Sequence, residues 1–358
     1  MKSCDEEAII FCNGDNDTFP LWYNLEVEQE RDDVRACNLS YLQTDWYISQ
    51  MKRPYYNSPG LPISWEYKDF MPGKNEVVWV ENRLNAPLEV KKAFQFLHSN
   101  DPRTKRDGEG YIPSDQLYVL SPDSQKINFK KAKRFTRSEM MVMEMLSTNE
   151  WKRPMYFATT IGSDYHLGLD PYLELTGMAY RITPERSKDG KPRVNTEVMY
   201  DNMLHKFKYG NMNVPGIYID ENTMRMCRTH RMMFSQLAEA LYYEGKYDKA
   251  LEVLDFAEEM LPGYNVNYDY TSGTMAALYY AMDEMEKGNA IMSALADNCV
   301  EYMEWAASLP PVQRKSVNQS TVGHYSAVLG FVLNNLQRFE QKELFNKYFA
   351  LYNQYGSR

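Results

Sequence analysis

The chain of 358 residues is 44% hydrophobic and 25% charged, which is the balance of a soluble globular protein with two or three domains. Its formal net charge of −9 argues against a general nucleic-acid-binding protein, because such a protein carries a basic face. No apolar run approaches the roughly 20 residues of a membrane-spanning helix, and the start, MKSCDEEAII, lacks a signal-peptide pattern. If the protein works outside the cytoplasm, we expect this chain to be part of a longer one.

The first elements follow the order strand, helix, strand, helix. Residues 8–13 (AIIFCN) form a short apolar run bounded by Gly14, and residues 33–42 (DVRACNLSYL) form a second run. Between them, residues 18–31 have helical spacing with Pro20 near the expected first turn. This order predicts a β-α-β-α unit with parallel strands and a right-handed crossover.

The next part of the chain alternates loops, helices and one strand. Residues 53–85 are rich in proline and have no sustained period, which predicts a long loop near a functional face. A helix is predicted at 88–98 and a mobile loop at 100–115. Residues 138–149 predict a buried, methionine-rich helix, and 153–159 predict a third strand of the same sheet.

The end of the α/β region has weaker patterns. Residues 168–177 (GLDPYLELTG) predict a helix, and residues 178–183 (MAYRIT) predict an edge strand. Residues 184–222 have no clear pattern, although YDNMLHKF at 200–207 is compatible with a helix.

From about residue 223 the pattern is continuously helical. Residues 237–262 (LAEALYYEGKYDKALEVLDFAEEMLP) match the spacing of a tetratricopeptide repeat, in which small side chains let two antiparallel helices approach closely. Gly245 is expected to end the first helix and Pro262 to stop the second. Two further hairpins, at about 270–307 and 319–355, fit the same plan more loosely. Such an array binds proteins or serves as a helical buttress, and both interpretations remain open.

Two basic runs interrupt this acidic chain, RTKR at 103–106 and KINFKKAKRFTR at 126–137. They are typical of a solvated face or a flexible loop, and the alternative is contact with an anionic lipid surface or a phosphate.

The stretch NGDND at 13–17 is the strongest polar constellation in the sequence. Three interpretations compete for it. Asp17 caps the following helix; or Asp15 and Asp17 hold a divalent ion against a diphosphate, as in nucleotide-sugar glycosyltransferases; or the loop binds polar groups of a ligand, with aromatic faces beside the carboxylates.

A second loop repeats this combination of an acid with a Trp-Tyr pair, QTDWY at 43–47. Because both loops follow parallel strands, we expect them to emerge at the same carboxyl edge of the sheet, where ligands bind in open sheets. The predicted ligand-binding residues are Asp15, Asn16, Asp17, Trp22, Tyr23, Asp45, Trp46 and Tyr47. The indoles have an alternative role, which is to pack helices against the sheet.

The sequence contains none of the common catalytic or nucleotide-binding motifs. There is no G-x-S-x-G, no Walker motif, no H-E-x-x-H and no G-x-G-x-x-G. The five cysteines contain no CxxC pair, and the five histidines lack metal-ligand spacing, with His166 and His205 as the two candidate bases. We predict no catalytic residue, no metal site and no cofactor for this chain.

Three stretches together resemble a known family: residues 9–52, 149–160 (NEWKRPMYFATT) and 168–184 (GLDPYLELTGMAYRITP). They are similar to a bacterial domain-of-unknown-function family of large multi-spanning membrane proteins, which are related to protein O-mannosyltransferases of the GT-C superfamily. The helical repeats after 223 fit the tail of that family.

The resemblance implies that the chain is the soluble C-terminal region of a larger integral membrane protein, on the extracytoplasmic (periplasmic) face, with the transmembrane part as its partner. In that superfamily the catalytic acid lies on an external loop of the membrane part and the donor is a sugar on a lipid phosphate. The isolated chain is therefore not expected to be catalytic. In distantly similar enzymes an external α/β domain grips the acceptor near a Trp-Trp-Asp type loop that follows a strand. By analogy, the residues that would take that place are Asp15, Asn16, Asp17, Trp22 and Tyr23, and those that would flank it are Asp45, Trp46 and Tyr47.

We therefore predict an α/β domain at 1–222, a three-layer sandwich with a mostly parallel sheet, followed by an all-α, tetratricopeptide-like domain at 223–358. The predicted function is recognition of an acceptor protein or glycan for a membrane-bound glycosyltransferase. One alternative is an interaction scaffold that binds a protein partner through the helical repeats. Another is a metal-dependent enzyme that uses Asp15 and Asp17.

Overall fold

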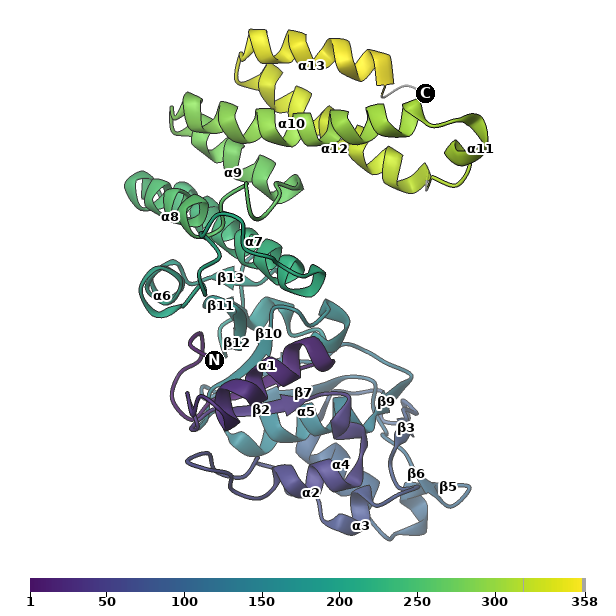
Figure 1. Ribbon diagram of the computed structural model, residues 1–358. Helices are drawn as coiled ribbons and strands as arrows, with labels where there is room; N and C mark the ends of the chain where they lie inside the picture. Colours follow the sequence, from purple (N-terminus) through teal and green to yellow (C-terminus); the bar gives the residue numbers. More distant parts are fainter. Residues whose placement is uncertain (318, 356–358) are drawn as a thin grey trace. The chain divides into compact units, whose positions relative to one another are not determined.

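The computed structural model describes residues 1–317 and 319–355. The chain divides into two compact units, Met1–Asn202 and Met203–Arg358, and each is described here by itself. The first unit combines helices with sheets and the second is helical, so the predicted order of an α/β region and an all-α region is confirmed (Figure 1). The domain boundary expected between residues 222 and 223 stays a prediction.

A six-stranded sheet forms the centre of the first unit. Its strands, in spatial order, are β13 (Arg193–Val194), β11 (Leu173–Leu175), β12 (Ala179–Ile182), β10 (Met155–Ala158), β1 (Ile9–Cys12) and β2 (Arg35–Asn38). β1 is parallel to both β10 and β2, whereas β12 is antiparallel to β10 and β11, and β11 is parallel to β13. The sheet is therefore mixed, with parallel pairs at both ends and the antiparallel β12 between them.

The parallel strands lie in the core. All four residues of β1, β2 and β10 are buried. Strands buried on both faces must be covered by other elements on both faces, which is the reason that they form continuous apolar runs rather than alternating ones. The pairing places Ile9 beside Met155 on one side and beside Arg35 on the other. Each fully buried aliphatic or aromatic side chain contributes about 1.5–3 kcal/mol.

The remaining elements of the first unit surround this sheet. Its helices are α1 (Asp15–Glu26), α2 (Asp45–Met51), α3 (Tyr67–Phe70), α4 (Val90–His98), α5 (Arg137–Asn149) and α6 (Thr196–Asp201). Three small sheets join β3 (Val77–Trp79) with β9 (Arg134–Thr136), β4 (Leu88–Glu89) with β7 (Leu117–Leu120) and β8 (Lys126–Asn128), and β5 (Lys105–Arg106) with β6 (Glu109–Gly110). The predicted helices at 88–98 and 138–149 are thus confirmed.

Arg137, the last residue of the basic run at 126–137, has a structural role. It begins α5 and its side chain is buried, with Nη1 donating to the carbonyl of Gln43 at 2.5 Å and Nη2 donating to that of Lys74 at 2.6 Å. Because Gln43 lies two residues before the start of α2, this arginine holds the turn that leads into α2. Elsewhere in the run, Lys130 pairs with Glu139.

Three local predictions were wrong. Residues 168–177 contain a short 3-10 turn at Asp170–Tyr172 and then β11, because the Leu173-Glu174-Leu175 alternation places both leucines in the core. β12 is an interior strand rather than an edge strand, since β11 covers its free side. Helix α1 begins at Asp15, earlier than residue 18, because Gly14 turns the chain directly after β1 with a φ of 80°.

The second unit consists of helices that pack in chain order, α7 with α8, α9 with α10, and α12 with α13 (Figure 1). They are α7 (Glu221–Tyr243), α8 (Tyr247–Met260), α9 (Tyr270–Ala281), α10 (Met285–Ser308), α11 (Pro311–Arg314), α12 (Gln319–Arg338) and α13 (Lys342–Tyr355). Ala238, Ala250 and Ala257 are fully buried and Gly245 turns the chain with a φ of 75°, as the repeat pattern predicts. None of the helices in the described residues combines the length and hydropathy of a membrane span.

A buried arginine ties the first helical hairpin to the loop that follows it. Arg231 of α7 is fully buried, and its guanidinium donates to the carbonyls of Leu261 at 2.6 Å, Val266 at 2.8 Å and Asn267 at 3.1 Å. Leu261 follows the last residue of α8, where the carbonyl groups have no partner within the helix. One side chain therefore supplies hydrogen-bond donors both to the carbonyl at the end of α8 and to the carbonyls of the turn toward α9.

We expect Arg231→Met to lower the free energy of unfolding by about 3 kcal/mol, because three buried carbonyls lose charge-assisted hydrogen bonds. The matched control is Arg228→Met on the exposed side of α7, which is expected to change it by less than about 0.5 kcal/mol. Urea unfolding monitored by circular dichroism measures both variants. Equal midpoints for the two variants would contradict the role given to Arg231.

Candidate functional site

The carboxyl ends of β1, β2 and β10 lie at one edge of the main sheet, because these three strands are parallel. The turn after β1 leads into α1, and the segment after β2 leads through a 3-10 turn (Tyr41–Gln43) into α2. Both loops that the sequence singles out, 13–23 and 43–47, therefore follow the same edge, as open parallel sheets require.

Hydrogen bonds link the three turns at this edge. Ser40 Oγ donates to Asn13 Oδ1 at 2.6 Å, which joins the turn after β2 to the turn after β1. Thr160 Oγ1, after β10, donates to Asp17 Oδ2 at 2.6 Å. Asp17 thus binds a neighbouring loop, and the first turn of α1 has no side-chain cap. The edge is a connected polar surface rather than three independent loops.

The predicted acids differ in their surroundings. Asp15 and Asn16 are exposed at the start of α1, whereas Asp45 is half-buried and accepts a hydrogen bond from the hydroxyl of Tyr67 at 2.9 Å. Within residues 1–317 and 319–355, no group of three or more His, Cys, Asp or Glu side chains is arranged to hold a metal ion. The acids contribute negative charge and hydrogen-bond acceptors to the edge.

A chain of aromatic rings connects α1, the 3-10 turn and α2. The Phe19 and Trp22 ring centroids are 5.8 Å apart, those of Trp22 and Tyr41 are 6.1 Å apart, and those of Tyr41 and Trp46 are 5.9 Å apart. The ring of Tyr47 contacts both Tyr41 and Trp46, with centroids 5.6 and 5.4 Å apart. Aromatic pairs at these distances stabilise the contact by about 0.5–1.5 kcal/mol beyond burial. The rings therefore hold the two helices together.

A cavity of about 240 Å³, here named the aromatic pocket, opens beside this chain of rings. Its walls include Trp22 and Glu26 of α1, Trp46 of α2, Arg35 of β2, and Tyr55 and Ser58 of the following loop. Trp46 is 54% exposed, so a large indole face remains open to solvent at the mouth. Of the eight predicted residues, Trp22, Trp46 and Tyr47 line the pocket, and the other five do not.

The two predicted tyrosines occupy opposite environments. Tyr47 is only 1% exposed, and its hydroxyl accepts a hydrogen bond from the backbone N–H of Asn38 at 2.9 Å. Burial raises the pKa of the Tyr47 phenol. Tyr23 is exposed and its hydroxyl donates to Glu28 at 2.7 Å. Tyr47 thus anchors α2 to the end of β2, while Tyr23 lies on the outer face of α1.

Arg35 is the pocket residue that sequence reasoning missed. It is 4% exposed at the first position of β2, and its Nη2 donates to the carbonyls of Gln50 at 3.3 Å and Arg53 at 3.1 Å, near the end of α2. Burial lowers the pKa of its guanidinium. The sequence contained one sign of this role, which is a charged side chain inside the predicted strand at 33–42. A charge that is buried in a strand needs a partner, and this need marks Arg35 as a candidate site residue.

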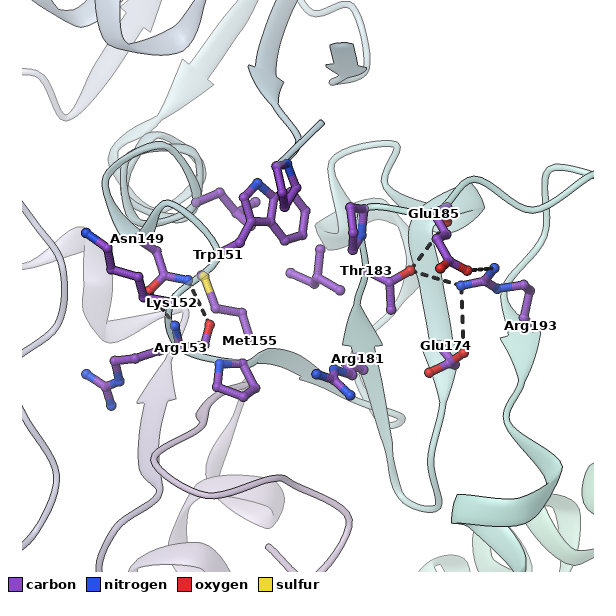
Figure 2. Close-up of a pocket in the computed structure, with 15 residues that line it drawn as sticks. Asn149, Trp151, Lys152, Arg153, Met155, Glu174, Arg181, Thr183, Glu185 and Arg193 are labelled. Carbon is purple, nitrogen blue, oxygen red and sulfur yellow. Dashed lines mark hydrogen bonds and ion pairs between the residues drawn. The ribbon is translucent and has the colours of Figure 1, made fainter. Parts of the chain in front are cut away.

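A second cavity, of about 430 Å³, lies at the amino end of β10 and is here named the amino-edge pocket (Figure 2). Trp151 faces Thr183 across it. Arg193 donates to Thr183 Oγ1 at 3.1 Å and to Glu185 at 3.0 Å, and Arg181 pairs with Asp5 at 3.0 Å. Two of the arginines that line this pocket, Arg181 and Arg193, are therefore paired with carboxylates.

The five cysteines are buried and free of disulfide bonds. Burial raises the pKa of the Cys12 thiol to about 11 and that of the Cys4 thiol to about 11, so both are protonated at neutral pH. They pack as small core side chains.

Comparison with known proteins gives one match. A family model described as TMEM260-associated domain 2 matches residues 1–199, which lie within the first unit. Neither the curated proteins nor the solved structures provide a match.

We expect Tyr47→Phe to lower the free energy of unfolding by about 1–3 kcal/mol, because the buried N–H of Asn38 loses its acceptor. Tyr23→Phe, the exposed control, is expected to change it by less than about 0.5 kcal/mol. Urea denaturation of both variants, followed by tryptophan fluorescence, compares the midpoints. A Tyr47→Phe midpoint equal to that of the unmodified chain would show that this hydroxyl does not anchor α2.

Proposed function

The chain belongs to the TMEM260-associated domain 2 family, and on that premise we propose that it recognises the acceptor for a membrane-bound glycosyltransferase. The family name ties the chain to a membrane protein as an associated region. TMEM260 is itself a protein O-mannosyltransferase. The resemblance of residues 9–52, 149–160 and 168–184 to proteins related to O-mannosyltransferases points in the same direction.

In this proposal the reaction itself belongs to the membrane part of the polypeptide. That part supplies the catalytic acid and binds the lipid-linked sugar donor, and the present chain holds the acceptor protein or glycan on the extracytoplasmic (periplasmic) side. A region that positions an acceptor needs neither a nucleophile nor a metal ion. Its contribution is to raise the local concentration and fix the orientation of the acceptor.

The observation that carries the proposal is the aromatic pocket. It combines an exposed indole, a second indole, hydrogen-bond acceptors and a guanidinium within one cavity of about 240 Å³. Small-molecule and glycan sites have this composition, with mainly apolar walls and a few placed polar groups. Its lining runs from Trp46 at the start of α2 to Arg35 at the first position of β2, so the pocket lies beside the edge strand of the main sheet.

Binding of candidate acceptor peptides and glycan fragments to the whole chain, measured by NMR titration, tests this function. We expect Trp46→Ala to weaken binding by about tenfold or more, because exposed indoles at the centre of a contact contribute more than 1 kcal/mol. Trp305→Ala removes an equally exposed indole from α10 and serves as the control. Unchanged binding in Trp46→Ala would exclude the aromatic pocket as the acceptor site.

The predicted acids are tested separately in the same titration. If Asp15 and Asp17 contact the acceptor directly, the double variant Asp15→Ala with Asp17→Ala is expected to weaken binding by about tenfold. Thr160→Val removes the hydrogen bond to Asp17 and leaves both carboxylates, so it separates the effect of the acids from that of the loop linkage. A double variant that binds like the unmodified chain removes these acids from the site.

The second candidate function is protein binding through the helical repeats. The observation in its favour is an exposed tyrosine cluster on the first hairpin, in which the Tyr242 ring lies 5.7 Å from that of Tyr243 and 5.2 Å from that of Tyr247. Crosslinking of the whole chain to the acceptor distinguishes the two functions. Loss of crosslinks in Tyr243→Ser with Tyr247→Ser, and not in Trp46→Ala, would favour the scaffold.

A further inference from the structure

Arg35 is a buried cation without a carboxylate partner. The groups that act on its charge are Cys37, Tyr47 and Tyr55, and within the described residues no Asp or Glu forms an ion pair with it. Its Nη1 is buried and has no hydrogen-bond partner. Proteins normally bury charges only in pairs, since an uncompensated ion costs several kcal/mol even after relaxation. A buried guanidinium at a pocket wall is therefore a place for an anion.

The groups that do contact Arg35 compensate its charge only in part. The carbonyls of Gln50 and Arg53 lie at the carboxyl end of α2, where the helix dipole favours a positive charge. Nε lies 3.5 Å from the sulfur of Met51, a weak acceptor. The ring of Tyr55 lies over the guanidinium with its centroid at 5.3 Å. These contacts orient the guanidinium and leave Nη1 as a donor.

A second arginine, Arg153, contacts one wall residue of the aromatic pocket from outside that pocket. Arg153 donates to the carbonyls of Glu7, Pro59 and Gly60 and, at 3.2 Å, to Oγ of Ser58, which lines the aromatic pocket. Burial lowers the pKa of Arg153, and the charge of Arg35 lowers it further. Arg153 therefore adds positive charge behind Ser58, although its own side chain lines the amino-edge pocket and not the aromatic pocket.

The outer wall carries the opposite charge. Glu26 accepts hydrogen bonds from the hydroxyls of Tyr55 at 2.7 Å and Tyr56 at 2.8 Å, and Asp32 accepts one from Asn57 at 2.8 Å. Each carboxylate can accept further hydrogen bonds. These two acids disfavour a doubly charged phosphate and favour a ligand with one negative charge and several hydroxyl donors.

We propose that the aromatic pocket binds a single sugar ring that carries a carboxylate, a uronic-acid-type residue of the acceptor glycan. The carboxylate accepts charge-assisted hydrogen bonds from Nη1 of Arg35, the nitrogen that has no partner among the described residues. The ring hydroxyls donate to Glu26 and Asp32, and the apolar face of the ring lies against the indoles of Trp22 and Trp46. This inference rests on the proposed function, because it names the ligand class of that same site.

The alternative ligands match fewer of these groups. An acidic peptide side chain supplies the carboxylate and lacks the cluster of hydroxyls that would satisfy Glu26 and Asp32. A neutral sugar supplies the hydroxyls and leaves Arg35 without an anion. Reaching Nη1 requires the ring of Tyr55 to move aside, which is feasible because this ring is 41% exposed and is held by its hydrogen bond to Glu26.

A matched pair of sugars tests the proposal with the whole chain at pH 7. Isothermal titration or NMR compares methyl glucuronide with methyl glucoside, which differ in the carboxylate group. We expect the uronide to bind at least about tenfold more tightly, since a hydrogen-bonded ion pair at a buried arginine exceeds 1.4 kcal/mol. Inorganic phosphate and a short peptide rich in Glu are the competing ligands. Tighter binding of either one, or equal binding of the two sugars, overturns the proposal.

Two variants test whether the preference for the uronide depends on Arg35. Arg35→Gln is expected to abolish the uronide preference, while Arg134→Gln, an exposed arginine of β9, retains it. Circular dichroism checks that Arg35→Gln is folded. If this variant does not fold, the test uses Trp46→Ala, which changes an exposed residue and must weaken the binding of both sugars by about tenfold. Failure of both variants to affect binding overturns the assignment of the pocket.

The result also separates this inference from the proposed function. If Trp46→Ala weakens acceptor binding and the two sugars bind equally, the acceptor site stands and the acidic sugar is excluded. If neither sugar binds and Trp46→Ala leaves acceptor binding unchanged, both the ligand class and the site are wrong.

Discussion

The parallel pairing of β1 with β2 and with β10 is the constraint on which the first unit depends. All residues of these strands are buried, so a shift of one residue in register would turn an entire set of core side chains to the wrong face. The register that satisfies the core also brings three strand ends to one edge. The hydrogen bonds between Ser40 and Asn13 and between Thr160 and Asp17 follow from that geometry.

The aromatic side chains have two roles at this edge. Trp22, Tyr41 and Trp46 hold α1 and α2 together, and the same rings leave an indole face open beside a cavity. Arg35 differs from these rings, because it is a buried cation whose Nη1 has no hydrogen-bond partner in the described part of the chain, and the ligand proposed above would supply one. Packing and recognition thus use the same side chains, which is the reason that sequence patterns alone do not separate them.

The helical unit has its own core and its own connections. Arg231 ties the end of α8 to the turn before α9, and small residues at Ala238, Ala250 and Ala257 permit close helix packing. The family match ends at residue 199, before these helices. The residues that line the aromatic pocket all belong to the first unit.

The sequence by itself determined the elements with strong local patterns: the apolar runs of β1, β2 and β10, the helix α5, and the first helical hairpin with its turn at Gly245. Only the tertiary structure decided that residues 173–175 form a strand, because an alternation of three residues is too short to specify a strand before it pairs with β12 and β13. It also decided that Tyr47 is an anchor, that Trp46 is exposed, and that Arg35 reaches the pocket. Periodicity fixes which face of an element is apolar, whereas burial of a single side chain depends on which distant segment covers it.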